Sequence, residues 1–392
     1  MTMDLDVLVL RGADVKVSKI NDFVGKVKGS KFVLLFCSLF DEFLSASFFN
    51  SCVEELNCPF VGVRTAGCVT PEGYVSEGVV AGVVHGDFDV SVFSEAVDFE
   101  DLEGTVKRCN SKITECELCM VFSSSHIRRS LHLNKLLLDI HDRFPDMQIW
   151  GGNSVAPSAL VTKDGIFEDH IAFVCLSKAK TDHKMETGFT LDEKREKYVV
   201  TKSDMYKIYE LDGENASEKY SKIQHMRPWL LNNVANLVTR HDISKLGKSM
   251  SLMNKTLYDG FMKSAVKLLG FRLSNEVVTA VGISYMDKDH ILPGTFVPEG
   301  TKLFFTESSE ESQLAVYDRL SEFKDNKFNL VASCLLRQYY INFQFEKVGE
   351  KMAKLGSPFI VAYLAGEISV KPRQKTKNIF HQCGIQVLGF KR

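Results

Sequence analysis

Short apolar segments alternate with amphipathic segments along most of this 392-residue chain. Residues 32–38, "FVLLFCS", form a continuous apolar run that is typical of a strand buried on both faces. From residue 44 to residue 56, apolar residues recur every four positions and so share one face of a helix. "PFVGVRTAG" (59–67) and "YVSEGVVAGVVHG" (74–86) then have the pattern of two strands. This region therefore predicts the order strand, helix, strand, strand.

The same order occurs twice more along the chain. The second copy comprises "LCMVFSS" (118–124), a helical stripe over 133–144, "MQIWGGNSVAP" (147–157) and, after the polar turn "TKDG", "HIAFVCLS" (170–177). The third comprises "FNLVASC" (328–334), a helical stripe over 345–355, "PFIVAYLAGEIS" (358–369) and "IFHQCGIQVLGF" (379–390). Repeats this far apart indicate duplicated subdomains and not a solenoid. We expect an α/β fold, mixed α+β, with layered sheets covered by helices.

Chain length and charge distribution suggest two domains. The chain exceeds the size at which one hydrophobic core stops growing. The most charged stretch between the halves, "AKTDHKMETGFTLDEKREK" (179–197), places a boundary near residue 185. We therefore expect one domain over 1–185 and a second over 186–392, with a mostly helical region over 217–270.

Composition narrows the functional classes. With 45% hydrophobic and 25% charged residues, the chain resembles an ordinary globular protein and not a disordered one. A net charge of −2 gives no support for nucleic-acid binding, so small molecules or proteins are the expected partners. Ten scattered cysteines are expected to be reduced and buried. The chain shows neither a signal-peptide pattern nor an 18-residue apolar run, which predicts a cytoplasmic protein without membrane contact.

The ends of the three equivalent strands carry the candidate site. In layered α/β folds, ligands gather where strands end and loops begin. These ends are "VRTAG", "GGNSV" and "YLAGE", and small residues beside them would let a ligand approach the backbone closely. The candidate ligand-binding residues at these ends are Arg64, Thr65, Gly67, Gly151, Gly152, Asn153, Tyr363, Gly366 and Glu367. Cys334, which ends another strand, and Arg337 three residues later complete the set.

Arg337 and Glu367 suggest which ligand class would bind. A guanidinium matches a carboxylate, and a carboxylate accepts hydrogen bonds from an ammonium. A free amino acid has both groups, so this pair would suit a zwitterionic metabolite. Two other interpretations stay open: Arg337 and Glu367 pair with each other, or both lie in solvated turns.

Catalytic and metal sites have little support in the sequence. Cys334 is a weak candidate nucleophile, with His381 or His85 as its base, but a structural thiol is the simpler interpretation. "CELC" (116–119) has the spacing of half a zinc site without a second pair. The basic run "KPRQKTK" (371–377) fits an exposed hairpin loop better than a phosphate site. The common nucleotide, hydrolase and metalloprotease motifs are absent, so we expect no enzyme, cofactor or metal.

The same segments resemble the FIST domain family, named for F-box and intracellular signal transduction. "VGVRTAG" and "GGNS" look like its N-terminal domain, and "YVVTKSDMYKIYELDGENASEKY" (198–220) is similar to its junction. "LVASCLLR" and "PFIVAYLAGEIS" look like the signatures of its C-terminal domain. The resemblance implies a FIST N-terminal-like domain over 1–185 and a FIST C-terminal-like domain over 186–392. The chain departs from the family where Cys68 follows Gly67, since the family often has Gly-Glu there.

What the resemblance implies is a sensor or interaction protein in intracellular signalling. Our leading hypothesis is a cytoplasmic protein that binds an amino acid or similar zwitterion and reports its occupancy through domain packing or a partner. The alternative is a protein-interaction scaffold or a substrate adaptor of ubiquitin-ligase type. The chain opens with FIST-like sequence, so we expect no F-box, which weakens the adaptor role.

Overall fold

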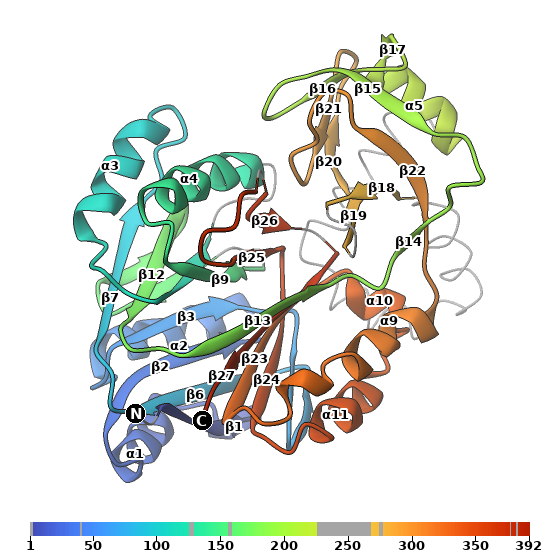
Figure 1. Ribbon diagram of the computed structural model, residues 1–392. Coiled ribbons are helices and arrows are strands. Elements are labelled where there is room, and N and C mark those ends of the chain that lie inside the picture. Colours follow the sequence, from blue (N-terminus) through green and yellow to red (C-terminus); the bar gives the residue numbers. More distant parts are fainter. Residues whose placement is uncertain are drawn as a thin grey trace.

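The computed structural model describes most of the chain, and three similar units make up its larger part (Figure 1). The described residues are 3–39, 41–124, 129–155, 159–225, 268–273, 277–376, 378–381 and 383–392. The predicted helical region over 217–270 falls largely outside them, with only α5 (Ala216–Gln224) at its start described.

Each unit contains a strand-helix-strand core flanked by antiparallel strands. The first unit comprises β1 (Met3–Leu10), α1 (Val17–Lys26), β2 (Ser30–Cys37), α2 (Glu42–Glu55), β3 (Phe60–Arg64), β4 (Cys68–Thr70), β5 (Gly73–Val75) and β6 (Val79–Gly86). The second comprises β7 (Val90–Ala96), α3 (Leu102–Lys112), β8 (Leu118–Ser123), α4 (Ser130–Arg143), β9 (Gln148–Asn153), β10 (Leu160–Thr162), β11 (Gly165–Phe167) and β12 (His170–Leu176). The repeated order predicted from sequence is therefore confirmed, as is the mixed α+β class.

The third unit is interrupted by a long insertion. Its own elements are β13 (Thr181–Glu186), α9 (Glu310–Asp318), β23 (Phe328–Cys334), α10 (Arg337–Tyr340), α11 (Phe345–Ala353), β24 (Phe359–Leu364), β25 (Glu367–Val370), β26 (Phe380–His381) and β27 (Ile385–Phe390). Besides α5, the insertion contains β14 (Thr190–Leu191), β15 (Tyr198–Ser203), β16 (Ile208–Leu211), β17 (Glu214–Asn215), β18 (Leu269–Arg272), β19 (Val278–Val281), β20 (Ile283–Met286), β21 (Ile291–Pro293) and β22 (Lys302–Glu307). These strands form a separate sheet, at the upper right of Figure 1.

Short hairpins are exchanged between the units in a cycle. The units build equivalent four-strand orders, β1-β6-β2-β3, β7-β12-β8-β9 and β13-β27-β23-β24. Each sheet is completed by a hairpin from another unit: β10-β11 joins β3, β25-β26 joins β9, and β4-β5 joins β24. The three sheets are therefore interlocked, and β13 belongs to the sheet of the third unit. The division at residue 185 stays a prediction.

Two sequence predictions about these hairpins were wrong. The segment 74–86 is not one strand, because β5 ends at Val75 and β6 begins at Val79. The segment 379–390, expected as one strand, is also two, because β26 ends at His381 and β27 begins at Ile385.

The strand end expected before Glu367 is confirmed, since β24 ends at Leu364 and Glu367 begins β25. A turn at Gly366, whose φ of +110° suits glycine, separates β24 from β25. Glu367 therefore lies in a paired strand and not in a solvated turn.

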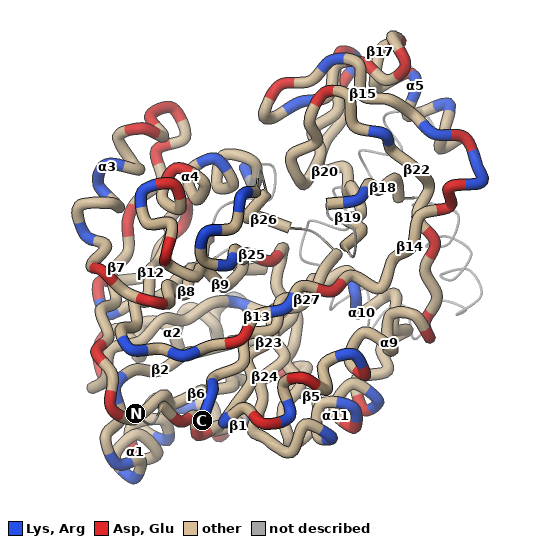
Figure 2. Tube along the Cα trace, viewed as in Figure 1, with Lys and Arg blue, Asp and Glu red and all other residues tan. Residues whose placement is uncertain are grey.

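One central hydrophobic core lies between the three sheets. Alternate residues of β2, β8 and β23 point into it, such as Phe36, Phe122 and Leu330. The residues between them face three outer cores, each formed with the helices of one unit. Leu44, predicted to lie on the buried face of α2, is instead 59% exposed in its first turn. In Figure 2, acidic and basic residues are interspersed on the outer helices and connections. None of the described helices has the length and hydrophobicity needed to span a bilayer.

Candidate functional site

The three equivalent strand ends meet, as their sequence positions suggested. Each end donates one backbone hydrogen bond to the next, and the three bonds form a closed cycle. The N–H groups of Ala66, Val155 and Ala365 donate, at 2.9 Å each, to the carbonyl groups of Tyr363, Arg64 and Asn153, respectively. This cycle, which we call the strand-end ring, follows directly from the hairpin exchange and makes Arg64, Asn153 and Tyr363 equivalent positions.

The candidate residues of the first unit already have contacts with other residues of the protein. The Arg64 side chain is buried and donates to the Leu39 carbonyl at 2.7 Å. The Thr65 hydroxyl lies 2.8 Å from the Ser38 hydroxyl. Gly67 has a φ of +140°, and a Cβ there would lie 2.4 Å from the Tyr74 hydroxyl. Contacts within the folded protein therefore account for the residue types at these three positions.

In the second unit, the glycines make room for protein and not for a ligand. A Cβ at Gly151 would lie 1.8 Å from the Val121 carbonyl oxygen, on the neighbouring strand. A Cβ at Gly152 would lie 2.5 Å from Leu364 Cδ1 and 2.9 Å from the carbonyl oxygen of Gly366. The close approach expected at these positions is therefore made by β8 and by the incoming chain of the third unit.

The third unit brings Arg337 and Glu367 into one buried region. Arg337 begins α10 and is 1% exposed, while Glu367 begins β25 and is fully buried. The Arg337 guanidinium donates to the Cys383 carbonyl at 3.0 Å. The Gly384 N–H donates to Glu367 Oε2 at 3.2 Å. Because Cys383 and Gly384 are consecutive, the two side chains contact one short backbone segment.

Arg337 is a buried cation held by uncharged groups. Besides Cys383, its acceptors are the Thr187 carbonyl, at 2.8 Å, and Oε1 of Gln313. Within the part of the chain that the structure describes, no carboxylate forms an ion pair with Arg337 at 4.0 Å or less. The interpretation in which Arg337 and Glu367 neutralise each other is therefore wrong. A buried guanidinium without an anionic partner favours an anionic ligand group.

Glu367 has an environment that favours the protonated carboxyl group. Burial raises its pKa well above the usual 4.5, and the nearby Cys334 raises it further. The Gly384 N–H and the Arg337 charge act in the opposite direction but do not reverse the shift. His381, which pairs with Glu367 across β25 and β26, has a pKa lowered to about 4 by its own burial. The raised pKa of Glu367 and the lowered pKa of His381 thus both favour the uncharged forms of these groups beside the Arg337 guanidinium.

Several buried polar atoms around this pair lack hydrogen-bond partners among the described residues. They belong to a set that we call the third-unit cluster: Tyr317, Ser333, Arg337, Tyr363 and Glu367. The atoms are the three hydroxyl oxygens, Arg337 Nε and Glu367 Oε1. Tyr317 is close enough to the other four residues for each of them to affect its pKa, which burial raises overall. The Tyr317 hydroxyl interacts with those of Ser333 and Tyr363, so Arg337 Nε and Glu367 Oε1 are the atoms of the cluster that stay without a partner among the described residues. An unsatisfied buried polar group costs about 1–3 kcal/mol.

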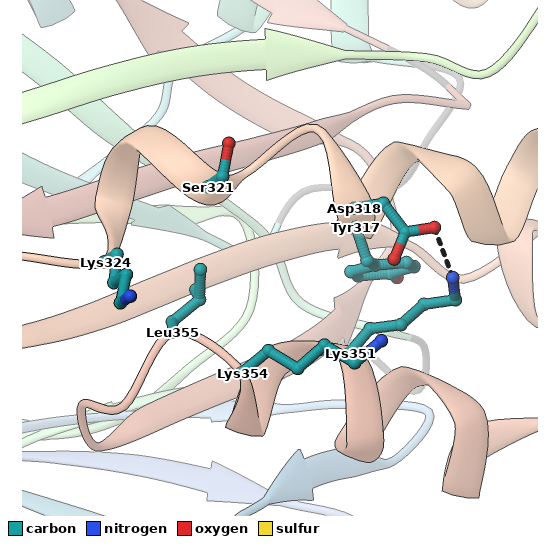
Figure 3. A pocket seen from close by; sticks show the side chains of 7 residues that line it. All are labelled: Tyr317, Asp318, Ser321, Lys324, Lys351, Lys354 and Leu355. Carbon is teal, nitrogen blue, oxygen red and sulfur yellow. Dashed lines mark hydrogen bonds and ion pairs between the residues drawn. The ribbon is translucent and has the colours of Figure 1, made fainter.

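Tyr317 also lines a hollow at the protein surface. It has a volume of about 140 Å³ and lies between α9 and α11 (Figure 3). Its lining residues are Tyr317, Asp318, Ser321, Lys324, Lys351, Lys354 and Leu355. Lys351 forms an ion pair with Asp318, as Figure 3 shows, so Lys324 and Lys354 leave the hollow with a positive charge. Tyr317 thus separates a positively charged hollow from the buried cluster.

The sequence did not single out several residues of this region. Tyr317 and Gln313 lie on α9, which carries none of the predicted site residues, and Cys383 and Gly384 lie in the connection before β27. The one sequence signal that could have identified them is Tyr317, because a leucine would fill the same buried helix face without a hydroxyl group. Cys334 itself is buried, and its hydrogen bond with Cys383, together with burial, raises its pKa well above 9. A reactive thiolate requires the opposite shift.

Substitution of Glu367 by glutamine tests its protonation state. Because the pKa is raised in the folded protein, its carboxyl group favours folding below about pH 4.5 and disfavours it increasingly as pH rises towards the folded pKa. We expect Glu367→Gln to gain stability over the wild type by up to about 1.4 kcal/mol per pH unit across this range. Urea denaturation of both proteins between pH 5 and 8 measures the difference. A stability difference that does not change with pH would contradict the assignment.

Comparison with known families agrees with the resemblance seen in the sequence. Residues 31–214 match the family model of the FIST N domain. The match spans the first unit from β2 to its end, the whole second unit, β13 and the start of the insertion. The resemblance of the remaining residues to the C-terminal FIST domain stays a prediction. No functionally curated protein matches the chain.

Proposed function

The chain belongs to the FIST family, and from that premise we propose that it is a non-enzymatic sensor that binds a small zwitterionic metabolite, such as an amino acid, in the third-unit cluster. The FIST domain is linked in general to sensing in signal transduction. The observation that carries the proposal is the pair of buried groups, Arg337 and Glu367, which share one backbone segment without forming an ion pair.

The chemistry of the pair matches the two ends of an amino acid. The Arg337 guanidinium would bind the ligand carboxylate and so acquire the anionic partner that it lacks. The ligand ammonium would donate to Glu367 Oε1, which has no partner among the described residues. An ammonium beside this carboxyl group favours its ionised form, so binding would release the proton from Glu367. The hydroxyls of Tyr317, Tyr363 and Ser333 would supply further hydrogen bonds.

The position of Arg337 offers a way to report occupancy. Two of its acceptors lie on the two connections between the third unit and the insertion: Thr187 directly follows β13, and Gln313 lies on the helix that follows β22. Ser312 and Gly188 also join these connections directly, at 3.0 Å. A ligand that competes for the guanidinium would change the attachment of the insertion. Occupancy would thereby alter the packing of the insertion or its contact with a signalling partner.

The positively charged hollow provides an approach for the ligand. Lys324 and Lys354 have no side-chain partner in the described part of the chain and would attract an anionic group from solvent. Arg337 and Glu367 are enclosed, so entry would require Tyr317 to move aside. The side chain of Tyr317 is thus the proposed gate between the hollow and the third-unit cluster.

Thermal stabilisation across a panel of amino acids tests the proposal. A ligand at 100 times its Kd should add about 2.7 kcal/mol to the free energy of unfolding. We expect a shift with at least one member for the wild type, and none for Arg337→Met with the same ligand. Arg319→Met is the matched control, because Arg319 pairs with Glu186 at the surface of the same region and should leave the shift unchanged. No shift with any member at millimolar concentration would count against the proposal.

A protein-interaction scaffold, or a ubiquitin-ligase adaptor, is the second candidate. The feature that favours it is a pair of adjacent hydrophobic side chains at the start of α2, Phe43 at 89% and Leu44 at 59% exposure. Two side chains are fewer than the apolar patch of several hundred Å² typical of an interaction site. The sensor proposal therefore has the stronger support. All ten cysteines are free thiols, which favours the cytoplasmic location that forms part of this proposal.

A further inference from the structure

Three cysteines of the second unit form a sulfur cluster apart from the site described above. Cys119 on β8 and Cys175 on β12 are direct partners across the two antiparallel strands. Their sulfur atoms are 3.8 Å apart, and both residues are buried in the core between the sheet and helices α3 and α4. Cys116 lies just before β8, is partly exposed, and contacts the Met147 sulfur at 3.5 Å.

The geometry of Cys119 and Cys175 permits a disulfide without rearrangement of the sheet. Directly opposed residues of antiparallel strands have Cα atoms about 4.5 or 5.5 Å apart, depending on their position in the ladder. Both distances lie within the range of about 4.4–6.8 Å found in disulfides. Rotation of the two side chains would be enough to bring the sulfurs from 3.8 Å to bonding distance.

We propose that Cys116, Cys119 and Cys175 form an oxidant-sensitive site that reacts with peroxides and ends as a Cys119–Cys175 disulfide. Cys116 is the entry point, because it is the most exposed of the three thiols. Its sulfur attacks one peroxide oxygen and becomes a sulfenic acid, and one water molecule leaves. Cys175 then attacks the Cys116 sulfur and expels hydroxide, which takes up the proton released by the thiols to give a second water. Finally Cys119 attacks the Cys175 sulfur and releases the Cys116 sulfur as a thiolate, which takes a proton from solvent, so two cysteines are oxidised and one peroxide is reduced.

The electrostatics of the cluster place the negative charge on Cys175, so Cys116 reacts as a thiol that passes its proton to the Cys175 thiolate. Cys119 acts to lower the pKa of Cys116, but Cys175 and burial raise it overall. Interactions with the Cys116 and Cys119 thiols lower the pKa of Cys175 to about 4, so Cys175 is the thiolate of the three. Burial raises the pKa of Cys119 well above its usual value, which keeps Cys119 a thiol until exchange. Cys109, on α3 in the same hydrophobic core, instead has a pKa raised to about 12, with burial as the largest cause. The lowered pKa of Cys175 is therefore not a consequence of its location in this core.

Peptide mapping after treatment with hydrogen peroxide tests the proposal. The full-length protein would be oxidised, blocked with a thiol reagent and digested. We expect one major disulfide, Cys119–Cys175, with Cys116 recovered as a free thiol. Cys116→Ala should slow its formation by at least about tenfold, because peroxide must then reach buried thiols. Cys119→Ala should stop the reaction at a Cys116–Cys175 disulfide.

Two controls separate this site from general thiol oxidation. Cys109→Ala removes a thiol from the same core and should leave the rate and product unchanged. Urea denaturation of each variant establishes that it is folded before oxidation. Disulfides spread over many of the ten cysteines would overturn the proposal, as would an unchanged rate in Cys116→Ala. Persistence of ten free thiols under peroxide would also overturn it.

Discussion

Gly151→Ala is expected to lower the free energy of unfolding by about 3 kcal/mol or more, at the upper end of overpacking costs. The added methyl group would lie 1.8 Å from the Val121 carbonyl oxygen and 2.7 Å from its carbonyl carbon. Both atoms belong to the backbone of a paired strand, so no side-chain rotation relieves the clash. β8 and β9 would have to separate, next to the strand-end ring. Urea denaturation of purified protein measures the loss.

The first unit supplies a matched control. Gly62 is equivalent to Gly151, because each precedes its ring residue, Arg64 or Asn153, by two positions. A Cβ at Gly62 would meet Leu35 Cβ at 3.4 Å and Val161 Cβ at 3.6 Å, which are ordinary contacts. We expect Gly62→Ala to change stability by less than about 1 kcal/mol. Equal effects of the two substitutions would contradict the close packing of β8 against Gly151.

Arg337→Ala is expected to lower the free energy of unfolding by about 3 kcal/mol, since three buried acceptors lose their donor at about 1–3 kcal/mol each, while removal of a buried charge offsets part of this cost. The loss should be concentrated at the attachment of the insertion, because two of these acceptors belong to Thr187 and Gln313. Hydrogen exchange should accelerate in the segments around residues 187–191 and 308–313. Urea denaturation and exchange mass spectrometry measure the two effects.

Arg319→Ala is the control for this substitution. Arg319 also lies beside these connections, but its side chain is 46% exposed in its ion pair with Glu186. Exposed ion pairs contribute at most about 1 kcal/mol, so we expect a small loss and little change in exchange. Similar behaviour of the Arg337 and Arg319 variants would show that Arg337 does not hold the insertion in place.

The sequence predicted those parts of the fold that depend on local patterns. Apolar runs such as 32–38 and 328–334 match β2 and β23 closely, because strands buried on both faces need continuous hydrophobicity. The short hairpins were missed or merged with longer strands, since three-residue strands such as β4 and β5 carry almost no periodic signal. Their exchange between units depends on contacts between distant residues, which a local pattern does not encode.

The sequence indicated that Arg337 and Glu367 lie in one region, but it did not predict their burial or its effect on the pKa of Glu367. Strand-end reasoning located Arg337 and Glu367, and the equivalence of the three ends appears in the strand-end ring. The complete burial of both side chains depends on Tyr317 and on the connection at Cys383, which come from separate parts of the chain. For the same reason the sequence suggested a charged carboxylate at Glu367, whereas burial raises its pKa. The glycines at 151 and 152 were assigned to a ligand because only the structure shows which atoms approach them.

Calorimetric titration of the stabilising amino acid at pH 6, in two buffers with different ionisation enthalpies, is the most direct test of the proposed sensor site. We predict saturable binding in which close to one proton per ligand passes to the buffer, because the ligand ammonium must displace the proton of Glu367. Glu367→Gln should bind more weakly and release none. Absence of binding, or binding with the same heat in both buffers, would contradict the account.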